Sequence, residues 1–152
     1  MPHDVVLEPV AARDKLALAR LLELYVYDYS EYMDWDVDDR GEFGYEHLDD
    51  YWTDADRHPF FIRVDGRLAG FALVHSGTPH DMAEFFVMRK YRRRGIATVA
   101  ARLAFSRFPG EWQVRQMPEN RAGTSFWHNA IPVPFREELR DGRPFQFFLI
   151  EA

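Results

Sequence analysis

Apolar and polar positions in the first third of the chain change from a strand-like run to helical spacing and then to an acidic, irregular segment. Val5–Val10 is a short apolar run of the kind found in strands. From Ala11 to Tyr29, apolar residues recur every three or four positions without Pro or Gly, which predicts an amphipathic helix. Residues 30–43 are rich in acids, and Tyr45–Trp52 predicts a second, shorter helix.

The pattern in the middle of the chain is that of strands. Pro59–Val64 and Leu68–Val74 are apolar runs on either side of Asp65-Gly66, a pair that is typical of a tight β-hairpin. A turn over residues 76–80 leads into a further predicted strand, Met82–Met88.

The rest of the chain alternates helices and strands and ends in a second hairpin around Asp141-Gly142. The predicted elements are a helix over Gly95–Phe108, a strand over Trp112–Met117, a helix over Arg121–Asn129 and strands over Val133–Leu139 and Phe145–Ile150. The resulting order is β-α-α-β-β-β-α-β-α-β-β. Hairpins at both ends of a β-α-β centre predict an α+β fold around one mixed sheet, rather than a doubly wound parallel sheet. The 152 residues fit a single domain over 1–152.

Composition excludes several kinds of chemistry. The chain has no cysteine, so disulfides, thiolate metal sites and a cysteine nucleophile are excluded. The histidines lack metal-ligand spacing, and we expect no metal. The N-terminal sequence MPHDVVLEPV has no secretory pattern, and no apolar run approaches the roughly 20 residues that span a bilayer, so we expect a cytoplasmic protein without a membrane partner.

Charge is unevenly distributed. The net charge is −6, yet residues 28–56 alone hold twelve acids and a single base, Arg40, which leaves the remainder mildly basic. This acidic segment is either solvated surface or a funnel for a cationic amine. Net charge argues against nucleic acid as a partner.

The segment from Glu84 to Thr98 carries the clearest chemical signal. An apolar strand runs into the basic loop Arg92-Arg93-Arg94-Gly95, and an Ala-rich helix begins there. The first turn of a helix has unpaired N–H groups and the positive end of the helix dipole. Gly95 and Ala97 are small enough for a ligand to approach the backbone, so the amides of residues 93–98 can surround a pyrophosphate, with the arginines adding positive charge.

These residues resemble motif A of the GNAT acetyltransferase superfamily, Arg/Gln-x-x-Gly-x-Gly/Ala. Arg92, Gly95 and Ala97 fill its three defined positions, and residues 120–127, Asn-Arg-Ala-Gly-Thr-Ser-Phe-Trp, resemble the family's Asn-x-x-Ala-x-x-aromatic-aromatic segment. The resemblance implies a mixed sheet of about seven strands with about four helices. It also implies a splay between strands four and five that admits the pantetheine arm of CoA.

The same resemblance implies a set of CoA-binding residues and a reaction. The implied CoA-binding residues are Phe86, Val87, Met88, Arg92, Arg93, Arg94, Gly95, Ile96, Ala97, Thr98, Asn120 and Phe126. Acetyl-CoA is then the cosubstrate of an N-acetyltransferase, in which the amine of a small cationic molecule or a peptide attacks directly within a ternary complex.

An amine must lose a proton before it attacks, so a base is needed. Asp81 and Glu84 are candidates on the strand that leads to the thioester, and His80 is a third. Alternation along a regular strand places Asp81 and Glu84 on opposite faces, which predicts that at most one of them points into the cleft.

The general acid is where the sequence departs from the family. Trp127 stands where many members carry a tyrosine that protonates the leaving thiolate, and indole has no useful acidity. Ser125 and His128 are nearby, and Tyr25 or Tyr29 becomes available if the first helix folds over the site. We take Asp81, Glu84 and Ser125 as the candidate catalytic residues, and the departure leaves open an alternative, a non-catalytic CoA-binding sensor or partner-binding module.

The last hairpin raises the question of assembly. Phe145, Phe147 and Phe148 fall close together there and can form a homodimer contact.

Overall fold

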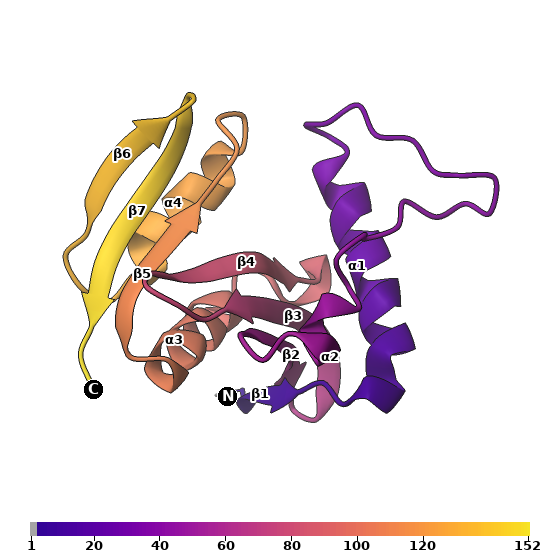
Figure 1. The fold of residues 1–152 in the computed structure, drawn as a ribbon, viewed down its shortest axis with the longest axis horizontal. Helices are drawn as coiled ribbons and strands as arrows, with labels where there is room; N and C mark the ends of the chain where they lie inside the picture. The colour runs from indigo at the N-terminus through magenta and orange to yellow at the C-terminus, as the bar shows by residue number, and fades with distance from the viewer. Residues whose placement is uncertain (1–2) are drawn as a thin grey trace.

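The computed structural model describes residues 3–152, and these form one mixed seven-stranded sheet covered by helices (Figure 1). The strands lie in the order β1-β2-β3-β4-β5-β7-β6, and their bounds are β1 Val5–Pro9, β2 Arg57–Val64, β3 Arg67–His75, β4 His80–Val87, β5 Gly110–Arg115, β6 Arg136–Arg140 and β7 Arg143–Ile150. The α-helices are α1 Lys15–Tyr29, α2 Asp50–Thr53, α3 Ile96–Arg107 and α4 Arg121–Ala130. Short 3-10 helices cover Ala12–Asp14 (η1) and Arg89–Tyr91 (η2). The predicted α+β class and element order are confirmed.

Both hairpins form at the Asp-Gly pairs. Asp65 and Gly66 have φ angles of 51° and 82°, and Asp141 and Gly142 have 51° and 76°. Left-handed conformations at both central residues define the turn whose twist matches that of the adjoining strands. Local turn chemistry therefore sets the register of β2 with β3 and of β6 with β7.

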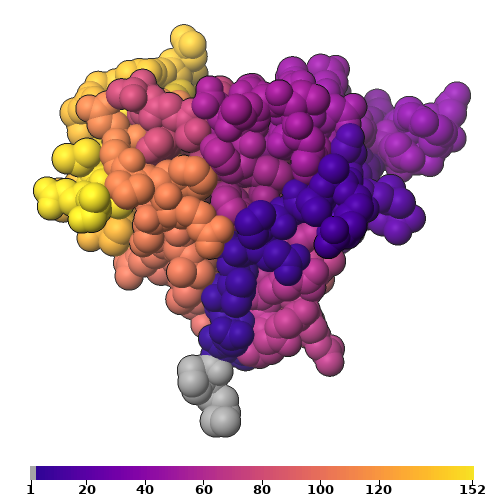
Figure 2. Space-filling view, turned by 60° about the horizontal axis from the view of Figure 1, so that its bottom comes forward, coloured from indigo at the N-terminus to yellow at the C-terminus, as the bar shows by residue number. Residues whose placement is uncertain are grey.

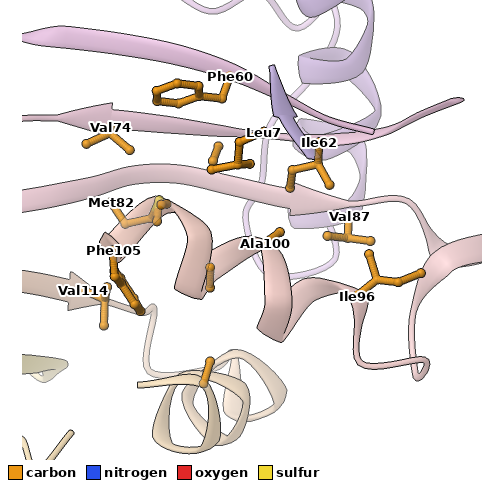
Figure 3. Close-up of a cluster of buried hydrophobic side chains, with 14 of the residues drawn as sticks. Leu7, Phe60, Ile62, Val74, Met82, Val87, Ile96, Ala100, Phe105 and Val114 are labelled. Atoms are coloured by element: carbon orange, nitrogen blue, oxygen red, sulfur yellow. The ribbon is translucent and has the colours of Figure 1, made fainter. Parts of the chain in front are cut away.

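Two hydrophobic clusters, one on each face of the sheet, hold the helices in place. On one face, Leu18 and Leu22 of α1 pack with Phe61, Phe71 and Leu73. On the other, a row of alanines in α3 lets the helix lie close to the strands, as Figure 3 shows for Ala100 near Val87 and Ile96. α1 and α2 therefore cover one face, whereas α3 and α4 cover the other.

Two predicted elements differ from the structure. The helix expected over Tyr45–Trp52 is reduced to turns and the four-residue α2, because the N–H groups of Leu48, Asp50 and Tyr51 donate to carbonyl oxygens three residues earlier and not four. The sixth strand begins at Arg136 rather than Val133. Pro132 and Pro134 lack the N–H groups that a strand needs.

The acidic loop between α1 and α2 projects from the body of the molecule (Figure 2). Glu23 on α1 accepts hydrogen bonds from the N–H groups of Phe43 (2.7 Å) and Gly44 (2.9 Å), which hold the base of this loop against the helix. None of the helices between residues 3 and 152 is long and apolar enough to cross a membrane.

The sheet parts in its centre. β4 and β5 are its parallel neighbours, and they pair only through His80 with Trp112 and Asp81 with Gln113. Beyond these residues β4 continues beside β3 alone and β5 beside β7 alone. The predicted splay between the fourth and fifth strands is confirmed.

Candidate active site

A cleft of about 1020 Å³ opens where β4 and β5 separate. Its floor is β4 from Met82 to Phe85, one wall is α1 with the acidic loop, and the opposite wall is the end of β5 with Trp127 and Arg143. Figure 1 shows α1 and the β5–β7 end of the sheet rising on the two sides of β4. Residues of both sheet faces line the cleft, so it reaches through the sheet at the splay.

A bulge in β4 decides which carboxylates face the cleft. Leu73 of β3 pairs with Glu84, but the next residue, Val74, pairs with Met82, so Ala83 is an extra residue in β4. The extra residue cancels the alternation, and Asp81 and Glu84 lie on the same face of the sheet. The expectation that they would occupy opposite faces was therefore wrong, because it assumed a regular strand.

Glu84 is the titratable group at the floor of the cleft. Tyr25 of α1 donates its hydroxyl hydrogen bond to Glu84 Oε1 at 3.4 Å. Burial raises the pKa of Glu84 to about 7, although the positive charge of Arg115 opposes the shift. Burial and the charge of Glu84 also raise the pKa of Tyr25. A carboxylate that titrates near neutral pH is suited to accept a proton from an ammonium group.

Asp81 and His80 are already engaged by other groups. Asp81 forms an ion pair with Arg115 and accepts a hydrogen bond from Gln113 Nε2 at 3.2 Å. The ring of His80 accepts from the Gly77 N–H at 2.9 Å and lies 2.9 Å from the Pro109 carbonyl oxygen. Asp81 and His80 therefore hold the start of β4 in place, and Glu84 is the candidate base with a free approach from the cleft.

The candidate acids fall on different sides of α4. Ser125 is exposed and lies in a shallow hollow between α4 and the last hairpin, whereas the cleft is lined without it. His128 pairs with Glu137 at 2.6 Å in the same region. Trp127 lines the cleft, and α1 does fold over it, bringing Tyr25 and Tyr29 into the lining.

The loop that begins α3 has the geometry of an anion cradle. Arg93 and Gly95 are left-handed, with φ angles of 60° and 76°, and Val99 donates to the Gly95 carbonyl oxygen at 3.2 Å as the first turn closes. The N–H groups ahead of Val99 have no partner further up the helix. The space beside Gly95 is open, because a Cβ there would meet no atom within 4 Å. Backbone and space therefore fit a phosphate group.

The three arginines of this loop, Arg92, Arg93 and Arg94, differ in role. Arg92 donates to the Val87 carbonyl oxygen at 2.8 Å and to Asp28 of α1 at 2.6 Å, and Arg89 reaches the same carboxylate at 2.6 Å. Burial favours protonation of Asp28, but the two arginines outweigh it and lower its pKa. Arg92 thus braces α1 against the loop, whereas Arg93 and Arg94 are exposed and can meet a phosphate.

The strand residues predicted to bind CoA have mostly buried side chains. Phe86 packs against Phe71, and the Met88 N–H donates to the Ala69 carbonyl oxygen at 2.8 Å. Val87 and Ile96 lie together in the core (Figure 3). The side chains of Phe86, Val87 and Ile96 therefore belong to the core, and that of Met88 is half-buried.

The family-like segment at residues 120–127 begins with a helix cap. Asn120 accepts a hydrogen bond from the Gly123 N–H at 2.9 Å and caps α4. A Cβ on Gly123 would lie 2.5 Å from Asn120 Nδ2, which explains glycine at this position. Phe126 stacks on Phe85, with ring centroids 5.8 Å apart.

At the start of α3, Ala97 and Thr98 are partly buried.

Sequence reasoning missed the two cationic residues of the cleft. Arg115 and Arg143 both line it, from β5 and β7. Arg115 could have been predicted, because it is a charged residue at the end of the strand that borders the splay. Arg143 carried no such signal, because its place depends on how the last hairpin pairs with β5. Residues 3–152 contain no group of three or more His, Asp or Glu side chains arranged to hold a metal ion.

A sheet parted between β4 and β5, with an open anion cradle at the start of α3, defines an acetyltransferase fold. The chain belongs to the acetyltransferase (GNAT) family, whose profile matches residues 18–130, and it is accordingly an acyltransferase. Among curated proteins, none matches it in sequence.

Solved structures are similar in fold at low sequence identity. An acetyltransferase from Thermus thermophilus has a TM-score of 0.75 at 15% identity, over 96% of this chain and 97% of that one. The PaiA N-acetyltransferase from Thermoplasma acidophilum, solved with coenzyme A, has a TM-score of 0.63 at 14% identity, over 98% and 99%. A ribosomal-protein alanine N-acetyltransferase from Escherichia coli has a TM-score of 0.70 at 12% identity, over 98% and 96%.

Proposed function

We propose that this protein, as a single cytoplasmic domain, transfers an acetyl group from acetyl-CoA to an amine of a small cationic molecule or a peptide. The observation that carries the proposal is Glu84, a carboxylate with its pKa raised to about 7, at the floor of a cleft that opens through the splay. Met1 and Pro2 belong to the predicted domain but lie outside the described residues.

Acetyl-CoA supplies a thioester whose carbonyl carbon is open to attack by a nitrogen lone pair. The chain's own contribution is to hold the phosphates and the amine at fixed positions and to take up a proton. The cradle around Gly95, with Arg93 and Arg94 beside it, fits a diphosphate. The small Ala97 leaves room for close approach to the first turn of α3.

Glu84 is suited to take the proton that the ammonium group must lose. Because its carboxylate is poised near neutral pH, it is partly deprotonated under those conditions and can still accept a proton. Tyr25, whose hydroxyl points at Glu84, fixes the orientation of the carboxylate. With Trp127 in place of a tyrosine, we propose that no side chain at that position protonates the leaving thiolate.

The acidic wall supports a cationic acceptor. Asp34, Asp36 and Glu46 line the cleft from the loop, and aromatic rings including Tyr29 and Trp35 lie among them. Carboxylates and aromatic faces attract ammonium groups. The structural similarity to a ribosomal-protein alanine N-acetyltransferase keeps peptide amines within the proposed class.

Cofactor binding is tested by thermal denaturation with and without CoA. We expect CoA to raise the melting temperature of the natural protein and to have no effect on Gly95→Glu, because the new carboxylate fills the open space of the cradle. Gly66→Glu is the matched control, since Gly66 also is left-handed (φ 82°) with open space around it but lies in the β2–β3 hairpin and not in the loop that begins α3. If CoA at millimolar concentration stabilises none of the three proteins, the proposal is wrong.

Catalysis is tested by following thiol release from acetyl-CoA with a panel of amines and basic peptides. Turnover with any of them supports the transferase and excludes a binding-only sensor. CoA binding without turnover across the panel would favour the sensor instead.

A further inference from the structure

The two walls of the cleft differ in charge. The loop that follows α1 contributes the acids Asp34, Asp36 and Glu46, whereas the opposite wall contributes two arginines, Arg115 and Arg143, and one acid, Glu119. A ligand that is only cationic would complement the acidic wall but offer no counter-charge to the arginines of the other.

The two arginines differ in whether their charge is already paired. Arg115 forms an ion pair with Asp81. Arg143 forms no ion pair with a carboxylate of residues 3–152, and the hydrogen bond it donates goes from Nε to the Gln116 carbonyl oxygen at 3.5 Å. A guanidinium group has five N–H donors, so the outer nitrogens of Arg143 remain free to bind a carboxylate.

The backbone that carries Arg143 is held by a buried amide pair. Gln116 and Gln146 are 2% and 0% exposed, and each donates to the side-chain oxygen of the other, at 2.6 and 3.0 Å. Gln146 also donates to Glu137 at 2.6 Å. These bonds fix β7 against the end of β5 at the rim of the cleft. The backbone at Arg143 is therefore held in one place.

Arg143 faces the same space as Glu84. Arg115 pairs with Phe145 in the β5–β7 ladder, and Arg143 lies two residues before Phe145, so both arginines project from the same face. The positive charge of Arg143 also acts on Glu84, where it opposes the effect of burial on the pKa. The free cation and the candidate base therefore line the same cleft, from β7 and β4.

We propose that the acceptor carries a carboxylate in addition to its amines, and that Arg143 binds this carboxylate and thereby directs an amine to Glu84. Arg143 is then a specificity-determining residue, and the acceptor class narrows to amino-acid-like molecules with a basic side chain, whose further ammonium group meets the acidic wall. The inference rests on the proposed function for its context, but it concerns binding and can be tested without turnover.

Lysine and 1,5-diaminopentane are a matched pair of probes, because they differ only by the carboxylate. Isothermal titration in the presence of CoA measures the affinity of each for the natural protein, Arg143→Gln and Arg140→Gln. Arg140 lies across the hairpin from Arg143 and is already paired with Glu138 at 3.0 Å, so its replacement changes net charge equally without touching the cleft. Arg143→Lys keeps the charge and guards against a merely misfolded variant.

We expect the natural protein and Arg140→Gln to bind lysine about tenfold or more tightly than 1,5-diaminopentane, as a charge-assisted hydrogen bond allows. Arg143→Gln should lose this preference, and Arg143→Lys should keep part of it. Equal affinity for both probes, no binding of either, or a preference that survives in Arg143→Gln would overturn the inference. If the preference is found but no amine is acetylated, the proposed function fails while the inference stands.

Discussion

Among single residues, Glu84 combines burial with a hydrogen-bonded neighbour. Its carboxylate lies between Tyr25 of α1 and the arginines of β5 and β7, and burial exceeds their opposing influence, so its pKa rises to about 7. Asp81, three positions earlier, shares the same face but is paired with Arg115. Glu84, which is buried and forms no ion pair among residues 3–152, can therefore exchange a proton near neutral pH.

Replacement of Glu84 by Gln should lower kcat by about 10²–10⁴-fold, the usual contribution of a general base. In the natural protein the rate should rise as pH increases through about 7, because the deprotonated carboxylate is the base. That inflection should be absent in Glu84→Gln, and a pH–rate profile measures it.

Asp81→Asn serves as the comparison for this experiment. It should retain the inflection, moved to lower pH, because the charge of Asp81 helps to raise the pKa of Glu84. Retention of the inflection in Glu84→Gln and its loss in Asp81→Asn would instead assign the base to Asp81.

At the level of elements, β3 and β4 approach each other unusually closely at Gly70. A Cβ there would lie 1.9 Å from the Phe86 carbonyl oxygen, which is backbone and cannot swing away. This contact sits beside the stretch of β4 that leads into the cradle, and the bulge at Ala83 lies a few residues upstream in the same strand pair. The pairing of β3 with β4 thus fixes both the cradle and the candidate base.

Gly70→Ala should therefore lower the free energy of unfolding by about 1–3 kcal/mol or more, as overpacking does in a buried site. Gly77→Ala is the control, because the added Cβ would lie 3.5 Å from its nearest neighbour, the Pro79 carbonyl oxygen, an ordinary contact. Urea denaturation measures both. Similar stabilities for the two variants would show that β3 and β4 can separate without penalty.

Across the whole molecule, charge is arranged around the cleft rather than spread evenly. The acidic loop stands on one side and the arginines of β5 and β7 on the other, while Asp28 ties α1 to the cradle through Arg89 and Arg92. This arrangement links function to stability, because a carboxylate that is buried for proton transfer destabilises the folded protein when it ionises.

Glu84 should for this reason make stability depend on pH. Its folded-state pKa of about 7 is above its ordinary value, so its favourable contribution is complete below pH about 4.5 and is lost as pH rises through 7. Relative to Glu84→Gln, the natural protein should lose about 1–3 kcal/mol of stability between pH 5 and pH 8. Denaturation at the two pH values measures the difference, and a constant difference would contradict the assignment.

The sequence by itself determined the order of elements, both hairpins and the cradle motif. The hairpins follow from Asp-Gly pairs, and the cradle from Arg92, Gly95 and Ala97 after a strand, so each rests on conformational preferences of adjacent residues. These preferences act over a few positions and can be read from the chain. The Tyr45–Trp52 helix was wrong, because residues 45–49 close turns through bonds to the carbonyl three positions earlier and only Asp50–Thr53 is α-helical.

Only the tertiary structure decided which side chains share the cleft. The bulge at Ala83 placed Asp81 and Glu84 on one face, the packing of α1 brought Tyr25 to Glu84, and the pairing of β5 with β7 brought Arg143 opposite. Ser125, close to Trp127 in sequence, was turned away on the outer side of α4. Register and helix docking depend on contacts between distant segments, so no local pattern in the sequence reports them.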